Sequence, residues 1–393
     1  MQPEQGPLGT DFACFFRGIY YNNSIKRRKR GETMGGEPSS YKGCLLGLAV
    51  GDAMGYTIND RTWRQICEDY GPNGLLGYDL VNGFAEVTSY THMAAYVCNG
   101  LLVGITKGRT DFALDYIRLG LREWTRSQLF HRDPEPSQCW VSRMSNMRRG
   151  NCQDIRMLDN LRQGIFGTMN ERTKHSLVPS ALTVPVAVGM FFDERWLTPR
   201  RVGALGAEAV ALTHGSSETF ISGALVAYMV AGILQDRETP LHTQFSYAVS
   251  AVMEQFGGVY SVTETVVDGV RRAMAMAKEG IDPREGMEVL RCHTAPECVA
   301  GAVFACLSSP EDFDSAIITA VNHSGQSAAV GALVGALMGA KLGEEALPEF
   351  YLECLEQRWT LSMLAEDMAK GSVIRGLFDD DWDQKYTHGM PLW

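Results

Sequence analysis

Two stretches, YKGCLLGLAVGDAMG (residues 41–55) and SAAVGALVGALMGAKLG (residues 327–343), each carry four glycines spaced four residues apart. The glycines are Gly43, Gly47, Gly51 and Gly55 in the first stretch and Gly331, Gly335, Gly339 and Gly343 in the second. A glycine inside a helix costs roughly 1 kcal/mol relative to alanine, so such rows persist where the missing side chains allow close packing. We therefore expect two helices that lie deep in the molecule and near each other.

Helical spacing of apolar residues continues through most of the chain after residue 40. Between residues 216 and 234, for example, Ile221, Leu225, Tyr228 and Met229 share one helical face. Alternating patterns typical of strands are nearly absent. We therefore predict an all-α fold, a compact multi-helix bundle. The predicted helices are 41–56, 60–70, 90–107, 110–127, 154–167, 198–213, 216–234, 242–256, 261–279, 295–308, 311–322, 327–342 and 345–370.

The composition divides the chain into three regions. Residues 1–40 are rich in glycine, asparagine and charge, and include the basic run KRRKR at 26–30, so we predict a mobile N-terminal leader. Residues 41–370 carry the helical pattern and are predicted to form one domain. Residues 371–393 include four aspartates around Trp382 and are predicted to form an acidic C-terminal tail.

Charge and composition also narrow the partners and the compartment. A net charge of -10 argues against a nucleic-acid partner, which would need a basic surface. We expect no membrane partner, because the longest clear apolar run, 328–340, is shorter than the ~20 residues that span a bilayer. The ten cysteines contain no CxxC pair, and Cys292, His293 and Cys298 lack a second pair at zinc-site spacing. These features are typical of a cytoplasmic protein with reduced thiols.

Four blocks in this order resemble the ADP-ribosylglycohydrolase family, which includes the dinitrogenase reductase-activating glycohydrolases. The blocks are 41–55, EVTSYTHM at 86–93, LTHG at 212–215 and AVNHSGQSAAVGA at 320–332. In the second and last blocks the family reads Thr-Asp-Asp-Thr-Gln-Met and roughly Gly-Gly-Asp-Thr-Asp-Thr. The resemblance spans about residues 41–345. It implies an all-helical fold and cleavage of the glycosidic bond between ADP-ribose and a modified side chain, assisted by two Mg²⁺ ions.

The resemblance also implies that most of the metal ligands are missing. Thr88 keeps a family threonine, whereas Asn59 aligns with the family's catalytic or gating glutamate. The family's metal ligands are replaced by Ser89 and Tyr90 in the second block and by Gln326, Ala328 and Ala329 in the last. Two adjacent Mg²⁺ ions require several carboxylates, which these residues do not supply. We therefore expect no metal site and no cofactor.

Both altered blocks directly precede predicted helices, and the start of a helix attracts anions through its free N–H groups and its dipole. We expect Ser, Thr and Asn residues to cap these helices, and an ADP-ribose-like or nucleotide-like ligand to bind there without metal. The candidate ligand-binding residues are Asp52, Asn59, Thr88, Ser89, Tyr90, His92, Asn322, His323, Ser324, Gln326 and Ser327.

Several of these candidates also have a structural interpretation. Asp52 is expected to be buried and hydrogen-bonded to the start of a neighbouring helix, and residues 322–324 are expected to cap the last conserved helix. Tyr90 is expected to fill the space that metal ions would need. For His92, a pocket-lining role and a hydrogen-bonded core role both stay open.

Three functional readings follow. The first is a catalytically inactive or diverged homologue that binds an ADP-ribose-like ligand. The second is an active hydrolase that uses relocated acids, with Asp60 and Glu86 as the catalytic candidates. The third is a structural or partner-binding protein in which Tyr90 closes the old cleft, with a protein as its partner.

Overall fold

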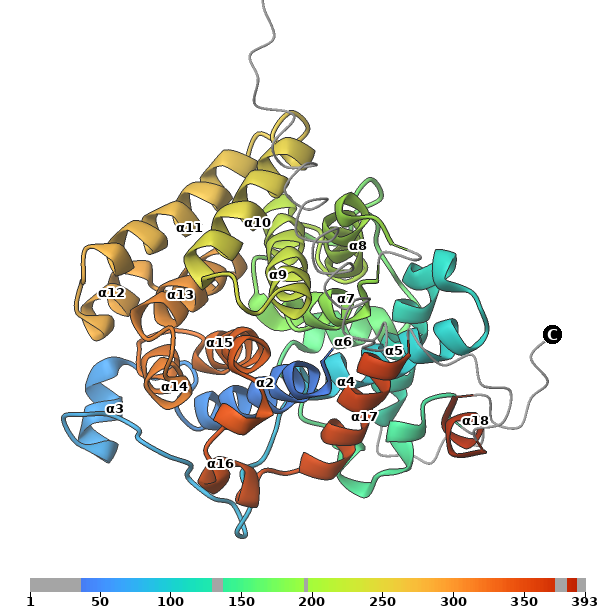
Figure 1. Cartoon of the computed structure of the whole chain (residues 1–393), viewed down its shortest axis with the longest axis horizontal. Coiled ribbons are helices and arrows are strands. Elements are labelled where there is room, and N and C mark those ends of the chain that lie inside the picture. Colours follow the sequence, from blue (N-terminus) through green and yellow to red (C-terminus); the bar gives the residue numbers. More distant parts are fainter. Residues whose placement is uncertain (1–36, 129–136, 194–196, 372–379, 387–393) are drawn as a thin grey trace, which may run out of the picture.

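The computed structural model describes residues 37–128, 137–193, 197–371 and 380–386 (Figure 1). These residues form 17 α-helices, α2 to α18, and several short 3-10 helices. Within the described ranges, β-pairing is limited to two isolated bridges, Val81 with Phe84 and Ala85 with Leu355. The predicted all-α fold is therefore confirmed.

The α-helices are α2 (Pro38–Ile58), α3 (Trp63–Tyr70), α4 (Ser89–Thr106), α5 (Ala113–Ser127), α6 (Ile155–Arg162), α7 (Val184–Phe191), α8 (Pro199–Ala211), α9 (Ser217–Gln235), α10 (Leu241–Phe256), α11 (Thr263–Lys278), α12 (Pro283–Leu290), α13 (Ala295–Ser308), α14 (Phe313–Val321), α15 (Ser327–Leu342), α16 (Glu349–Cys354), α17 (Arg358–Lys370) and α18 (Asp380–Tyr386). The predicted segment 60–70 begins later, at Trp63, because Thr62 and Gln65 form a capping box there. The predicted segment 345–370 is two helices, separated at Gln357, whose φ is 65°.

Helices α2 and α15 pack antiparallel at the centre of the molecule, glycine against glycine (Figure 1). A Cβ atom added to Gly43, Gly47 or Gly51 would lie well within 3.0 Å of the facing backbone of α15. The predicted close approach of the two glycine rows is therefore confirmed. Two positions differ from the pattern, because Gly55 faces Ser327 and Gly343 ends α15 with a φ of 87°.

Helix α9 lies in the core. Among the described residues it is the one helix long and apolar enough to cross a membrane. Its 19 residues exceed the apolar run 328–340, which the sequence suggested as the longest clear one. Of its apolar window, 94% is buried inside the fold. That burial is typical of the central helix of a helical bundle.

Part of the C-terminal segment packs against the bundle. Trp382 of α18 donates a hydrogen bond to Thr106 at the end of α4 (2.9 Å), and Tyr386 donates one to Asp367 of α17 (2.7 Å). Residues 380–386 of the expected acidic tail thus form a docked helix. The predicted mobile leader lies outside the described residues, except for residues 37–40, where α2 already begins.

Candidate functional site

The site lies where the C-terminal half of α2 meets the first turn of α4. Asp52 of α2 is fully buried. It accepts hydrogen bonds from the backbone N–H groups of Thr88 (2.8 Å) and Thr91 (3.1 Å) and from their hydroxyls (2.7 and 2.6 Å). Burial raises the pKa of Asp52, and these four hydrogen bonds oppose the rise. Asp52 thus holds the start of a neighbouring helix, as the sequence predicted.

Three N–H groups at the start of α4, those of Thr88, Tyr90 and Thr91, are consequently bound by the protein itself. Besides the bonds to Asp52, the Tyr90 N–H donates to the Thr88 hydroxyl (3.2 Å), and the His92 N–H donates to the Thr88 carbonyl (3.1 Å). Ser89, the first residue of α4, is 6% exposed. The expectation of free N–H groups for an anion is therefore wrong at these positions, because a carboxylate of the protein already occupies the helix start.

Tyr90 is buried in the first turn of α4, with 7% of its surface exposed. Its backbone carbonyl accepts a hydrogen bond from the Thr183 hydroxyl (2.7 Å). Burial raises the pKa of the phenol well above its usual value, and electrostatic repulsion from Cys298, Asp52, Asp60 and Asp154 raises it further. A buried, neutral phenol therefore occupies a position where the resemblance implies an aspartate.

The start of α15 is capped from across the chain. Asn59, which ends α2, accepts a hydrogen bond from the Ala328 N–H (3.0 Å), and its own amide donates to Asp60 (3.0 Å). The side chain of Gln326 donates to the Asp60 carboxylate. Asp60 is exposed and has a φ of 60°, and its N–H donates to the Gly325 carbonyl (3.2 Å). Asn59, Asp60 and Gln326 thus form one polar group that reaches solvent.

The prediction that residues 322–324 cap the last conserved helix, α15, is wrong. Asn322 ends α14 and binds both the N–H (2.8 Å) and the carbonyl (2.9 Å) of Leu75, so it fixes the loop that follows α3. The Ser324 hydroxyl accepts a hydrogen bond from the Trp63 N–H (2.7 Å) and thus binds the start of α3. Ser327 is buried, and its hydroxyl reaches only the His323 carbonyl (3.5 Å). Caps made by residues distant in sequence have no local signature.

Two candidate histidines are fully buried. Neither ring nitrogen of His92 has a hydrogen-bond partner among the described residues. The ring of His323 lies near the Ala320 carbonyl, and this contact partly opposes the effect of burial on its pKa. Burial lowers the pKa of His92 to about 3 and that of His323 to about 4, so both rings are neutral at pH 7. His92 is therefore a core histidine, and the described residues do not supply the hydrogen bond expected for that role.

Glu86 lies apart from Asp60 in its contacts. Its carboxylate pairs with Arg149 (3.1 Å), whose guanidinium also binds the buried Glu356 (3.1 Å). Asp60 instead binds Gln326 and Asn59. The described contacts therefore place the two candidate catalytic acids in separate hydrogen-bond groups.

A third polar group was not among the predicted site residues. The Ser180 hydroxyl donates to Asp154 (2.7 Å) and lies 3.0 Å from Nε2 of His214, whose Nδ1 lies 2.8 Å from the Thr213 hydroxyl. Asp154 also caps α6 through the Met157 N–H (2.9 Å). The signals available in the sequence were the block LTHG and Asp154, a residue type common at helix N-caps that stands at the start of the predicted helix 154–167.

The order of contacts in this third group differs from a nucleophilic triad. Asp154 contacts the serine and approaches Nε2 of His214 (3.6 Å), whereas a triad acid binds the opposite nitrogen. Burial lowers the pKa of His214 to about 4. The group is therefore a buried polar network that joins α6 to the connection between α8 and α9.

The residues present do not fit two Mg²⁺ ions. Three acids that raise the pKa of Tyr90 electrostatically are already engaged, Asp52 by four hydrogen bonds, Asp60 by two amides and Asp154 by Ser180 and a helix start. In the described ranges, no three His, Cys, Asp or Glu side chains are close enough together to hold an ion. The nearest other oxygens are neutral hydroxyls and amides, which do not offset the charge of two divalent ions.

Comparison with known proteins agrees with this fold. The family model described as ADP-ribosylglycohydrolase matches residues 37–377. A solved structure described as an "ADP-ribosylglycohydrolase-related protein complex" is similar in fold, with a TM-score of 0.53 and 20% identity, covering 86% of this chain and 99% of that chain. No curated protein matches the chain. Since the family model covers most of the sequence, the chain belongs to the ADP-ribosylglycohydrolase family.

Proposed function

We propose that this chain is a diverged ADP-ribosylglycohydrolase-family protein that binds an ADP-ribose-like ligand without magnesium and does not hydrolyse it in the metal-dependent manner. The observation that carries the proposal is a buried, neutral tyrosine, Tyr90, at a position where the resemblance implies an aspartate. A phenol adds bulk without adding charge. It therefore takes up space and offers no negative charge to a pair of divalent ions.

Asn59, Asp60 and Gln326 support ligand binding at this site. A partly exposed carboxylate accepts hydrogen bonds from ribose hydroxyls, and neighbouring amides donate to ring and phosphate oxygens. Asp60 also has a left-handed backbone conformation, which is uncommon outside glycine and is frequent at functional positions. These features favour a polar, metal-free recognition site over a purely structural role.

Two measurements test the proposal. Calorimetric titration with ADP-ribose in EDTA should show binding that Mg²⁺ does not strengthen, and Gln326→Ala should weaken it by about tenfold, the loss of one charge-assisted hydrogen bond. Gln163→Ala, at an exposed position outside the site, is the matched control. An ADP-ribosylated protein should not lose its ADP-ribose faster with Mg²⁺ than with EDTA.

Each alternative has its own outcome. Metal-dependent release of ADP-ribose would contradict the proposal. Metal-free release that disappears in both Asp60→Ala and Glu86→Ala would favour the hydrolase with relocated acids. Absence of any ADP-ribose binding would favour the structural or partner-binding role.

A further inference from the structure

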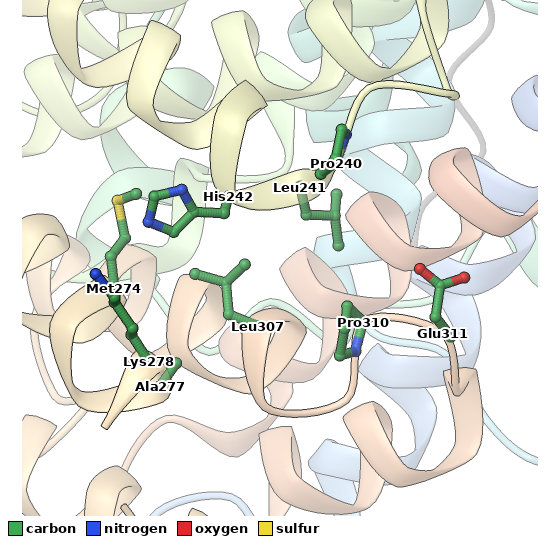
Figure 2. Close-up of a pocket in the computed structure, with 9 residues that line it drawn as sticks. All are labelled: Pro240, Leu241, His242, Met274, Ala277, Lys278, Leu307, Pro310 and Glu311. Atoms are coloured by element: carbon green, nitrogen blue, oxygen red, sulfur yellow. The ribbon is translucent and has the colours of Figure 1, made fainter. Parts of the chain in front are cut away.

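A pocket of about 300 Å³ lies between α10, α11 and the connection from α13 to α14 (Figure 2). Leu241, Met274 and Leu307 provide much of its apolar wall, while Lys278 and Glu311 lie toward opposite ends. This volume is at the lower end of ligand-binding pockets and accommodates an aromatic side chain. The function proposed above does not use this pocket.

The pocket adjoins the point at which the N-terminal segment enters the described fold. Glu37, directly before α2, pairs with Arg237 (3.5 Å), three residues before the pocket residue Pro240. Lys341, at the end of α15, binds the Thr239 carbonyl (3.2 Å) in the same connection. The pocket therefore lies near the start of α2 and the end of α15, whereas the site at Asp52 and Asn59 lies toward the end of α2.

The N-terminal segment contains an apolar pattern that suits this pocket. Phe12, Phe15, Phe16 and Ile19 are spaced as on one face of a helix. The stretch from residue 21 to residue 37 spans up to about 50 Å when extended, which is ample for a pocket beside Glu37.

Charge draws the N-terminal segment toward the rest of the chain. The basic run 26–30 belongs to a chain whose net charge is -10, so the remainder of the chain is more acidic still. At the pocket itself, the exposed acids Glu238 and Glu311 are balanced by Lys278 in the wall and Arg237 beside it, so the apolar fit, and not charge, selects the pocket.

We propose that residues 12–21 bind back onto the same chain, with a phenylalanine side chain in the pocket between α10, α11 and α13. Tethering raises the effective concentration of the segment to the millimolar range, so a weak fit is sufficient. The phenylalanine side chain would then bind at the end of the α2 and α15 pair that lies far from Tyr90.

Cys14 lies within this segment and provides a direct probe. In the full chain, with the half-buried Cys67, Cys152 and Cys354 changed to serine, we would compare Lys278→Cys with Arg64→Cys. Both parent residues are exposed and basic, but Arg64 lies on α3, beyond the far end of the 21-residue helix α2. A short bismaleimide cross-linker and mass spectrometry then report how fast Cys14 joins each position.

We expect the Lys278→Cys chain to cross-link to Cys14 about tenfold faster than the Arg64→Cys chain, because docking raises the local concentration. Adding Phe15→Ser and Phe16→Ser should remove the difference, and Leu307→Trp, which fills the pocket, should reduce it. Equal rates in the starting pair would overturn the proposal. The proposal would also be overturned if cross-linked dimers formed in place of intrachain products. It would likewise be overturned if the chain sedimented with phosphatidylglycerol vesicles and Cys14 then lost its preference for the cysteine at position 278.

Discussion

Asp52 organises the first turn of α4 from a position that solvent does not reach. Replacing it with asparagine leaves one oxygen to accept four hydrogen bonds and sets an N–H₂ group against donors of Thr88 and Thr91. We expect Asp52→Asn to lower the free energy of unfolding by about 2 kcal/mol, measured with urea at pH 7. Asp69→Asn, which removes an exposed partner of Arg61, should change it by less than about 0.5 kcal/mol. Equal stability of both variants would refute the structural role of Asp52.

His92 makes stability depend on pH. Its pKa is about 3 in the fold and about 6.5 for an ordinary histidine, so at intermediate pH the unfolded chain binds a proton that the folded chain excludes. The stability contribution is complete above pH 6.5 and is lost as the pH falls toward the folded pKa, at up to about 1.4 kcal/mol per pH unit. We expect His92→Leu to flatten this part of the profile between pH 7 and 5, measured by chemical unfolding.

The control for His92 is an exposed histidine. His175→Leu should leave the pH profile as in the wild type, because that ring lies in solvent. At pH 7 we expect His92→Leu to be close to neutral, because neither ring nitrogen loses a protein partner. A decrease of several kcal/mol in the free energy of unfolding at pH 7 would show that the imidazole of His92 makes a stabilising interaction other than the contacts described above.

At the residue scale, the sequence predicted the role of a side chain where neighbouring residues carry the signal. Asp52 follows a glycine within a glycine-rich helix, and its burial and capping role could be inferred from that setting. The caps of α15 and α3 could not, because Asn59 binds Ala328 and Ser324 binds Trp63 across more than 250 positions. The network around Ser180 likewise depends on three separate elements meeting in space.

At the scale of elements, the α2 and α15 pair is the contact least tolerant of added volume. A methyl group at Gly47 would meet the Gly335 backbone, which cannot rotate away as a side chain can. We expect Gly47→Ala to lower the free energy of unfolding by about 3 kcal/mol or to prevent folding, measured by thermal or urea unfolding. The added methyl group forces the two helices apart, and the free-energy cost of this separation exceeds the gain in helix propensity.

Gly269 of α11 provides the matched control. Its nearest neighbour, the Cβ of Ala300, would lie 3.9 Å from an added methyl group, which is ordinary contact. Gly269→Ala should therefore stabilise the chain by up to about 1 kcal/mol. If both substitutions had the same sign and size, close packing would not explain the glycine rows.

Helices with a clear pattern were predicted, and those without one were not. α7 is buried on every side and thus has no polar face from which a period could be read. α12 and α18 are short, with eight and seven residues, and give too few turns for a period. The break at Gln357 depends on one left-handed residue, which has no strong signature when that residue is not glycine.

For the whole molecule, the question is how much negative charge the old metal site retains. The resemblance implies which family ligands are replaced, whereas the structure shows that Asp52, Asp60 and Asp154 are engaged by hydrogen bonds. The sequence could not predict most of these bonds, because Thr88, Gln326 and Ser180 lie far along the chain from the acids that they bind.

Restoring the missing ligands tests this charge argument directly. The variant would combine the substitutions Ser89→Asp, Tyr90→Asp, Gln326→Asp, Ala328→Asp and Ala329→Thr. Without metal, uncompensated buried carboxylates should lower its Tm below that of the wild type. Magnesium should then recover about 3 kcal/mol at a hundred times its Kd, since it binds the folded state only.

The wild-type chain is the control, measured by thermal unfolding with Mg²⁺ or EDTA at equal ionic strength. Its Tm should not respond to Mg²⁺, because hydroxyls, amides and a phenol do not replace the charge of several carboxylates. A wild-type Tm that rises with Mg²⁺ as much as that of the restored variant would mean that the engaged acids can exchange their present partners for metal. Asp52, Asp60 and Asp154 would then be the next residues to substitute. Each of these acids would have to give up a helix cap or an amide contact in order to bind an ion, so they are the places where the metal would compete with contacts of the protein.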